Sequence, residues 1–154
     1  MNFSKFNLAV VIPAYRTEKE ILAVLQGIPA FIRHIIVVDD ASPDSSADLV
    51  TAAAKKNRRI LLVRKAKNQG VGGAMVTGFK KALELGAEIV IKLDGDGQMD
   101  PQYIPALITP LITGEADYAK GNRFRDFDAL RQMPIVRRIG NLGLSFLTKA
   151  ATGY

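Results

Sequence analysis

The stretch Ile89-Val90-Ile91-Lys92-Leu93-Asp94-Gly95-Asp96-Gly97-Gln98 decides the fold and the candidate site of this chain. Its apolar first half is typical of a buried strand, and two aspartates one residue apart follow directly. In a mostly parallel α/β sheet, ligands bind just beyond the carboxyl ends of the strands. Two carboxylates at such an end form an all-oxygen site suited to Mg²⁺ or Mn²⁺ carrying a phosphorylated ligand. The alternative is an acidic turn that only closes a strand, and for an isolated Asp-x-Asp it would be the better interpretation.

Apolar runs of strand length alternate with helical patterns along the whole chain. This alternation predicts an α/β fold with a parallel sheet and right-handed crossovers, in one domain over residues 1–154. Thr17 and Ser42 are expected to cap the helices that follow them, with Pro43 at the first position of the second helix. Strands are expected at residues 8–13, 35–38, 60–63, 89–93 and 118–120, and helices at 17–28, 43–56, from the glycine-rich loop 67–73 to about 85, from 101, and from 135 to about 151.

Three strand ends are expected to meet at one edge of this sheet. They carry Pro13-Ala14-Tyr15, Asp39-Asp40 and Asp94-Gly95-Asp96. A cleft of nucleotide size at this edge is a geometric consequence of the strand assignment.

Composition narrows the class of protein. Hydrophobic residues make up 48% of the chain and charged residues 23%, as in ordinary globular proteins, and the absence of cysteine excludes disulfides and thiolate zinc sites. Residues 119–154 hold seven Lys and Arg and two Asp, so this segment carries most of the net charge of +6 of the whole chain. This basic segment indicates an anionic partner such as a phosphate or a lipid surface. Scattered aromatic residues and the absence of Trp argue against nucleic acid, and no apolar run is long enough to span a bilayer.

Five motifs resemble the family 2 glycosyltransferases in their order and spacing. They are Val11-Ile12-Pro13-Ala14-Tyr15, Val37-Val38-Asp39-Asp40-Ala41-Ser42-Pro43-Asp44, Asn68-Gln69-Gly70-Val71-Gly72-Gly73-Ala74, Leu93-Asp94-Gly95-Asp96-Gly97-Gln98 and Gly121-Asn122-Arg123-Phe124. The Asp-x-Asp-x-Gln form, with Met133-Pro134 and Arg137 further on, is similar to the branch that acts on polyprenyl phosphates. The resemblance covers about residues 8–124. It implies the GT-A fold, a mostly parallel, Rossmann-like sheet flanked by helices.

The resemblance assigns the donor phosphates and the metal to the stretch after residue 93. Asp96 and Gln98 would hold a divalent metal, Mg²⁺ or Mn²⁺. Asp94, next to Gly95, would face the ribose and the water shell of the metal. Such a metal neutralises the charge that grows as a nucleoside diphosphate leaves.

The resemblance also implies a base pocket. Asp40, with Asp39, resembles the residues that accept hydrogen bonds from the nucleobase, and Pro13, Ala14 and Tyr15 would shape the pocket around it. The family often has Asn-Glu directly after this tyrosine. Here Arg16-Thr17 occupies those places, and Glu18 is a substitute one residue later.

The glycine-rich loop provides two further candidate donor-binding residues. Asn68 and Gly70 are similar to the family's Asn-x-Gly, and glycine permits close backbone approach. A dinucleotide-binding fingerprint is excluded because it should follow the first strand, and because Met75 occupies its third glycine position.

Arginines near the C-terminus are the candidate acceptor site. Arg123 and Arg137 match basic positions of the polyprenyl branch that clamp a lipid phosphate, and Arg138 could share that role. Bidentate pairing suits arginine to phosphate. Ordinary surface charge is the alternative for these side chains.

The resemblance therefore implies an enzyme, a hexosyltransferase at the cytoplasmic face of a membrane. It would transfer a sugar, with inversion, from a GDP- or UDP-sugar to a polyprenyl phosphate such as dolichyl or undecaprenyl phosphate. A homo-oligomer is compatible with the sequence. Because the family's domain normally continues beyond Tyr154, we expect a chain truncated at its C-terminus.

Three other functions stay open at this point. The chain could transfer sugar to a saccharide hydroxyl in cell-wall, capsule or glycan synthesis. It could be a nucleotide-binding module without transfer activity. It could also be a basic domain that binds membranes or nucleic acid, although the five ordered motifs argue against this.

Overall fold

The computed structural model describes residues 2–121. The chain divides into two compact units, residues 1–119 and 120–154, and the fold described below is that of the first. The single domain over residues 1–154 therefore stays a prediction. The helix expected from residue 135 lies outside the described residues, as do Arg123, Arg137 and Arg138.

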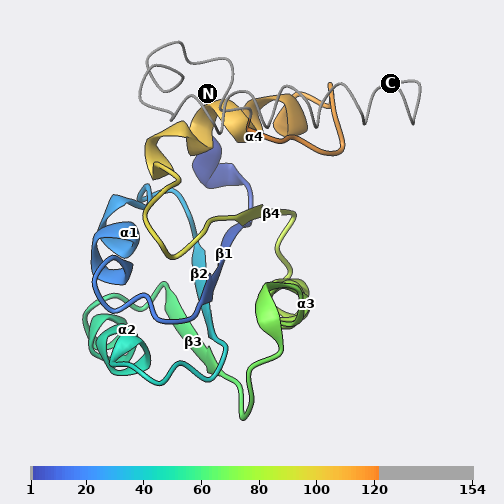
Figure 1. Cartoon of the computed structure of the whole chain (residues 1–154). Coiled ribbons are helices and arrows are strands. Elements are labelled where there is room, and N and C mark those ends of the chain that lie inside the picture. The colour runs from blue at the N-terminus through green and yellow to red at the C-terminus, as the bar shows by residue number, and fades with distance from the viewer. Residues whose placement is uncertain (1, 122–154) are drawn as a thin grey trace, which may run out of the picture. The chain divides into compact units, whose positions relative to one another are not determined.

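A four-stranded parallel sheet forms the centre of this unit (Figure 1). Its strands are β1 (Leu8–Ala14), β2 (His34–Asp39), β3 (Ile60–Arg64) and β4 (Ile89–Lys92), in the order β3-β2-β1-β4. All three neighbouring pairs are parallel, with Ala14 opposite Asp39 at the end of the central pair. The α/β fold and four of the expected strands are thus confirmed.

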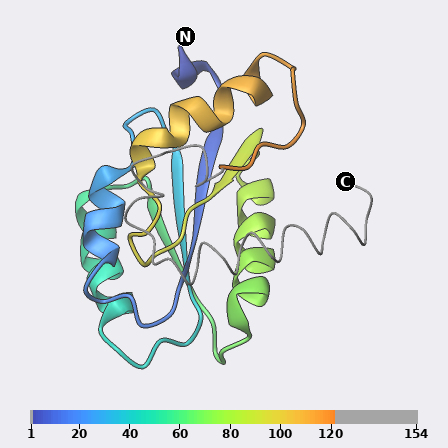
Figure 2. The same cartoon turned by 45° about the horizontal axis from the view of Figure 1, so that its top comes forward.

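Helices cover both faces of the sheet, with α1 and α2 on one face and α3 on the other (Figures 1 and 2). The helices are α1 (Ile21–Gly27), α2 (Ser46–Lys56), α3 (Gly70–Glu84) and α4 (Ile104–Ile112), and the short 3₁₀ segments are η1 (Phe3–Lys5) and η2 (Pro101–Tyr103). Gly86, with a φ of 69°, follows the end of α3, where a left-handed residue stops a helix. No helix within residues 2–121 is long and apolar enough to cross a membrane.

Three local predictions are wrong. Residues 118–120 are not a strand, because Tyr118 is 79% exposed and a run of three residues is not stable without a paired neighbour. The first two helices begin at Ile21 and Ser46, later than expected. Thr17 and Ser42 do not cap them, because their hydroxyls bond elsewhere: that of Thr17 donates to the Ser46 hydroxyl, and that of Ser42 accepts the Arg16 N–H and donates to Asp44.

Alternation along the strands divides the core into two layers. Leu8, Val10 and Ile12 of β1 pack with α1, α2 and α4, whereas Ala9 and Val11 pack with α3. Both layers are fully buried along β1, as expected for a central parallel strand. The same alternation in β2 sends two successive residues at its end, Asp39 and Asp40, to opposite faces of the sheet.

Candidate functional site

Backbone hydrogen bonds hold the four strand ends together at one edge. The Asp40 N–H donates to the Ala14 carbonyl at 3.0 Å, and the Lys65 N–H donates to the Asp39 carbonyl at 2.9 Å. On the other side of β1, the Leu93 N–H donates to the Val11 carbonyl at 3.0 Å. The edge that carries the predicted site residues is therefore a continuous ladder.

Gly95 lets the acidic loop after β4 lie directly against the end of β1. A Cβ atom at this position would lie 3.2 Å from the Pro13 carbonyl oxygen and 3.3 Å from Cγ2 of Thr17, closer than most side chains tolerate. Gly97 has a φ of 72°, which favours glycine. The two glycines of the motif thus have different functions, close approach and a left-handed turn.

The carboxylates of the acidic loop differ in their surroundings. Asp96 is exposed, and its Oδ1 accepts the Gln98 N–H at 3.0 Å. Asp94 is partly buried, and its Oδ1 lies 2.6 Å from Nζ of Lys92, the last residue of β4. Asp96 is therefore the carboxylate with an oxygen open to a ligand, whereas Asp94 is held by a cation.

The residues of this loop fit a hard divalent cation. Mg²⁺ typically keeps several waters and takes one or two carboxylates together with substrate phosphates. Asp94, Asp96 and the amide oxygen of Gln98 supply such a set of oxygen donors. No group of three or more acidic, His or Cys side chains lies within residues 2–121 in a metal-binding arrangement. The donor set is thus one that a phosphorylated ligand would complete.

Asp40 is a buried carboxylate that is already well supplied with donors. Both of its oxygens lie 3.0 Å from the Gln69 N–H, and Nζ of Lys65 lies 3.1 Å from Oδ1. Burial alone would raise its pKa, but the Gln69 N–H and the Lys65 ammonium outweigh burial and lower the pKa below 3.8. Asp40 is therefore ionised, and its remaining lone pairs can still accept a hydrogen bond.

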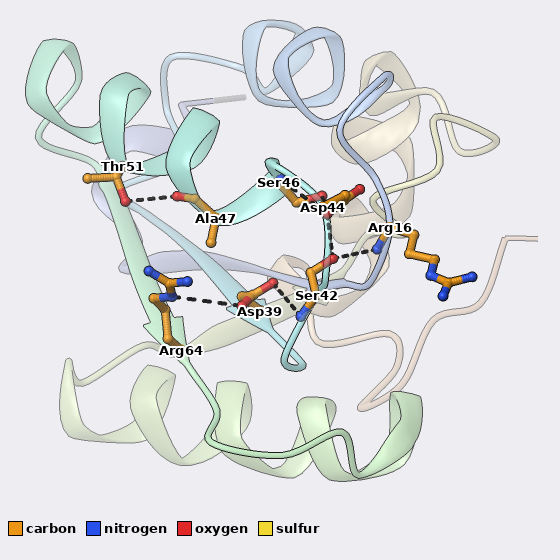
Figure 3. A network of polar contacts seen from close by, with 8 residues as sticks. All are labelled: Arg16, Asp39, Ser42, Asp44, Ser46, Ala47, Thr51 and Arg64. Atoms are coloured by element: carbon orange, nitrogen blue, oxygen red, sulfur yellow. Dashed lines mark hydrogen bonds and ion pairs between the residues drawn. The ribbon is translucent and has the colours of Figure 1, made fainter.

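Asp39 lies on the opposite face of the sheet and has weaker partners. Its Oδ1 accepts the Ser42 N–H at 3.3 Å, and Nε of Arg64 is 4.0 Å from Oδ2 (Figure 3). Burial raises its pKa above 3.8, only partly offset by the Ser42 N–H and Arg64. Of the two aspartates predicted to meet the base, Asp40 thus holds its charge more firmly.

Asp44, which the sequence did not single out as a site residue, joins the loops after β1 and β2 (Figure 3). Its Oδ1 accepts the hydroxyls of Ser42 at 2.7 Å and Ser46 at 2.6 Å, and its Oδ2 accepts the Glu18 N–H at 3.2 Å. The Ser42 hydroxyl in turn accepts the Arg16 N–H at 2.7 Å. The two serines that flank Asp44 in sequence were the available signal, because clustered Ser and Asp favour local side-chain networks.

Replacement of Asp44 by Asn is expected to destabilise the fold in a pH-dependent manner. Burial opposes ionisation, but the Ser42 and Ser46 donors outweigh it and lower the pKa from 3.8 to about 2. The ionised form therefore stabilises the fold above about pH 4, and this contribution is lost as the pH falls toward 2. Because solvent screens a partly exposed group, we expect about 1 kcal/mol at pH 7.

Urea unfolding of the wild type and Asp44→Asn at pH 7, 4 and 2.5 measures this difference. The exposed Asp48→Asn on α2 is the matched control and should change stability by less than about 0.5 kcal/mol. A difference between wild type and Asp44→Asn that is the same at pH 7 and 2.5 would contradict the assigned pKa.

The end of β1 and the loop after it contain the other predicted pocket residues. Ala14 is buried, Pro13 is partly buried and Tyr15 is 44% exposed, with the Arg16 guanidinium 5.4 Å from its ring centre. Glu18 Oε2 accepts the Ser45 N–H at 3.2 Å, so this carboxylate binds the start of α2. An open hollow of about 410 Å³ lies between the loops, lined by Arg16, Glu18, Lys19, Glu20, Pro43 and Asp44.

The loop before α3 places Asn68 and Gly70 at the start of that helix. The Asn68 side-chain oxygen accepts the Gly70 N–H at 3.0 Å, and Gly70 has a φ of 75°. Among the described residues, no atom beyond its chain neighbours and the helix backbone lies within 4 Å of the place that a Gly70 Cβ would occupy. Glycine is needed here for its backbone conformation, and the space beside it is open.

The predicted donor-site residues are thus brought together by one edge of a parallel sheet, and the chain can be compared with known proteins. The family model described as "Glycosyl transferase family 2" matches residues 9–153. The chain belongs to this family. The match includes every motif from which the resemblance was drawn.

Named members of the family are similar over nearly the whole chain. A UDP-N-acetylglucosamine–dolichyl-phosphate N-acetylglucosaminyltransferase of Methanococcus voltae is 35% identical, over 94% of this chain and 63% of that protein. An undecaprenyl-phosphate 4-deoxy-4-formamido-L-arabinose transferase of Pectobacterium carotovorum is 32% identical, over 96% of this chain and 44% of that protein. The family 2 chain thus spans between about two fifths and two thirds of the length of these relatives.

A solved structure shares the fold. A mannosyltransferase of Pyrobaculum calidifontis, solved in complex with GDP-Man and Mn²⁺, is 25% identical and superposes with a TM-score of 0.50. The match covers 59% of this chain and 28% of that one. The four-stranded parallel sheet flanked by helices is therefore that of the GT-A glycosyltransferases, as the resemblance implied.

Proposed function

We propose that this family 2 chain carries the donor site of an inverting glycosyltransferase that moves a sugar from a nucleoside diphosphate to a polyprenyl phosphate. The observation that carries the proposal is the meeting of two acidic segments, Asp39-Asp40 and Asp94-Gly95-Asp96, on either side of the end of β1. One segment suits a base and the other suits a metal-bound diphosphate. The names of the relatives, which include dolichyl- and undecaprenyl-phosphate transferases, support the acceptor class.

The base would bind beside Asp40. An ionised carboxylate accepts but cannot donate, so it selects an N–H edge such as the imide of uracil or the lactam of guanine. Because Asp40 is only 3% exposed, a small part of its carboxylate would be open to that edge. Tyr15, half-exposed after β1, would cover one face of the base.

The diphosphate would lie over the acidic loop, within reach of Asp96 and Gln98. A divalent metal held there, Mg²⁺ or Mn²⁺, would neutralise charge on the departing nucleoside diphosphate. Asp94, fixed by Lys92, would hold the ribose edge of the donor. Gly95 keeps this loop close to β1, so base and diphosphate sites stay at a fixed separation.

The acceptor chemistry needs little from the protein beyond orientation. An oxygen of the lipid phosphate attacks the anomeric carbon, the bond from that carbon to the diphosphate oxygen breaks, and the leaving group keeps the electron pair. Since a phosphate is already anionic at pH 7, no general base is required. We assign the holding of this phosphate to Arg123 and Arg137, a role that Arg138 would share, at the cytoplasmic face of a membrane.

A transfer assay tests this proposal. The chain is incubated with radiolabelled UDP- or GDP-sugars, Mn²⁺ or Mg²⁺, and vesicles that contain dolichyl or undecaprenyl phosphate. Label that moves into the lipid phase, as a sugar phosphate sensitive to mild acid, is the expected result. Label transferred to a saccharide hydroxyl instead, or nucleotide binding with neither transfer nor donor hydrolysis, would contradict the proposed acceptor.

A further inference from the structure

Lys65, which immediately follows β3, has an ammonium group buried at the donor edge. Its side chain is 9% exposed, and Nζ has no hydrogen-bond acceptor in good geometry within residues 2–121. Its ionic partner is Asp40, whose Oδ1 is 3.1 Å away. Burial of an ammonium group with a single counter-ion costs desolvation free energy. This cost indicates that the group has a structural or functional role.

Gly73 makes room for this ammonium. A Cβ atom on Gly73 would lie 3.0 Å from Nζ of Lys65 and 2.7 Å from Cβ of Gln69. A glycine inside a helix costs about 1 kcal/mol relative to alanine. Gly73 therefore makes the first turn of α3 less stable than alanine would, but it leaves space for the buried Lys65–Asp40 pair.

We propose that Lys65 is a positioning residue of the donor site, which holds the Asp40 carboxylate ionised and correctly oriented to receive the nucleobase. This inference rests on the proposed function. Lys65 would act through Asp40, because its Nζ is buried against that carboxylate, 3.1 Å from Oδ1. Without the ammonium, Asp40 would keep the backbone N–H groups of Gln69 and Gly70 and would take up a proton more readily.

The surroundings of Asp40 contain few other groups that could take over this role. At the start of α3 its carboxylate faces two peptide N–H groups, those of Gln69 and Gly70. The neighbouring charges are Asp39 and its partner Arg64, which lie on the other face of the sheet. Among the described residues, Lys65 is therefore the cation in ion-pair contact with Asp40.

The test is calorimetric binding of UDP and GDP, with Mn²⁺, between pH 5 and pH 8. For Lys65→Met we expect the affinity for the nucleotide to be at least about tenfold lower than that of the wild type at pH 8. As the pH is lowered past the pKa of Asp40 in this variant, the affinity should fall further, by up to about tenfold per pH unit. The affinity of the wild type should change with pH only as far as the nucleotide phosphate itself titrates. The wild-type measurements over the same pH range show the size of that effect. Asp40→Asn should bind weakly with the wild-type pH profile.

A double variant separates positioning from a structural role. Lys65→Met/Asp40→Asn removes both buried charges and should fold and bind like Asp40→Asn alone, since Lys65 acts only through Asp40. Lys65→Met that binds with wild-type affinity and pH profile would overturn the inference while leaving the proposed function intact. A wild type that binds neither nucleotide would overturn the proposed function and the inference together.

A second readout applies if Lys65→Met does not fold. The carbon-13 shift of the Asp40 carboxyl in the wild type should change when nucleotide binds, and should show an ionised group down to pH 5. A carboxyl that titrates above pH 5, or that does not respond to nucleotide, would overturn the inference.

Discussion

Asp96→Asn is expected to lower the rate of sugar transfer by about 10²–10³-fold, the size of effect seen when a group that stabilises developing charge is removed. Asp96 is exposed in the loop after β4, and within residues 2–121 its Oδ1 accepts only the neighbouring Gln98 N–H. The substitution keeps the size of the side chain and its turn-forming oxygen, but removes the negative charge. Initial rates measured over a range of Mn²⁺ concentrations check this prediction.

Asp100→Asn is the matched control for this substitution. Asp100 lies four residues further on, where its carboxylate caps η2 by accepting the Gln102 N–H at 2.9 Å. Asn caps helices about as well as Asp, so this variant should keep its fold and its rate within about threefold of the wild type. If Asp96→Asn retained the wild-type rate and metal dependence, the acidic loop would not be the metal site.

Gly78→Val is expected to destabilise the fold by about 3 kcal/mol or more. Gly78 is buried in α3, where the helix crosses the centre of the sheet. A Cβ atom there would overlap Cγ1 of Val11 and lie 3.2 Å from Cγ2 of Val38. Both valines are fully buried in central strands, so neither can move aside cheaply.

Chemical denaturation measures this loss, with Gly72→Ala as the control on the same helix. In the described part of the chain, a Cβ on Gly72 would meet no atom within 4 Å apart from its chain neighbours and the helix backbone. Alanine there should therefore leave stability unchanged or raise it by up to about 1 kcal/mol. Equal unfolding free energies for Gly78→Val and the wild type would show that α3 does not pack this closely on β1 and β2.

The sequence predicted the sheet and the meeting of its strand ends because both depend on short-range patterns. Runs such as Ile35–Val38 are apolar on both faces, and only a central parallel strand needs this. Parallel pairing then places Asp39, Asp40 and Asp94 at one edge without further information. The residues beyond Gly121, including the proposed acceptor arginines, lie outside the described part and stay predictions.

The helix starts and the Asp44 network could not be predicted in the same way. Thr17 and Ser42 look like helix caps in sequence, but each meets a partner from the other loop, 26 to 29 residues away. Long-range bonds of this kind override a local capping preference. The Ser and Asp cluster around Asp44 indicates a local network but not the partner loop that it binds. The Lys65–Asp40 pair was missed for the same reason.

The central claim is that the edge formed by the ends of β1, β2 and β4 binds a nucleoside diphosphate together with a divalent metal. Isothermal titration of the wild-type chain with UDP and GDP, with and without Mn²⁺, tests it most directly. We predict that one of the two nucleotides binds clearly more tightly, and that its binding weakens at least tenfold when Mn²⁺ is omitted. A cooperatively folded sample that binds neither nucleotide, with or without the metal, would contradict the claim.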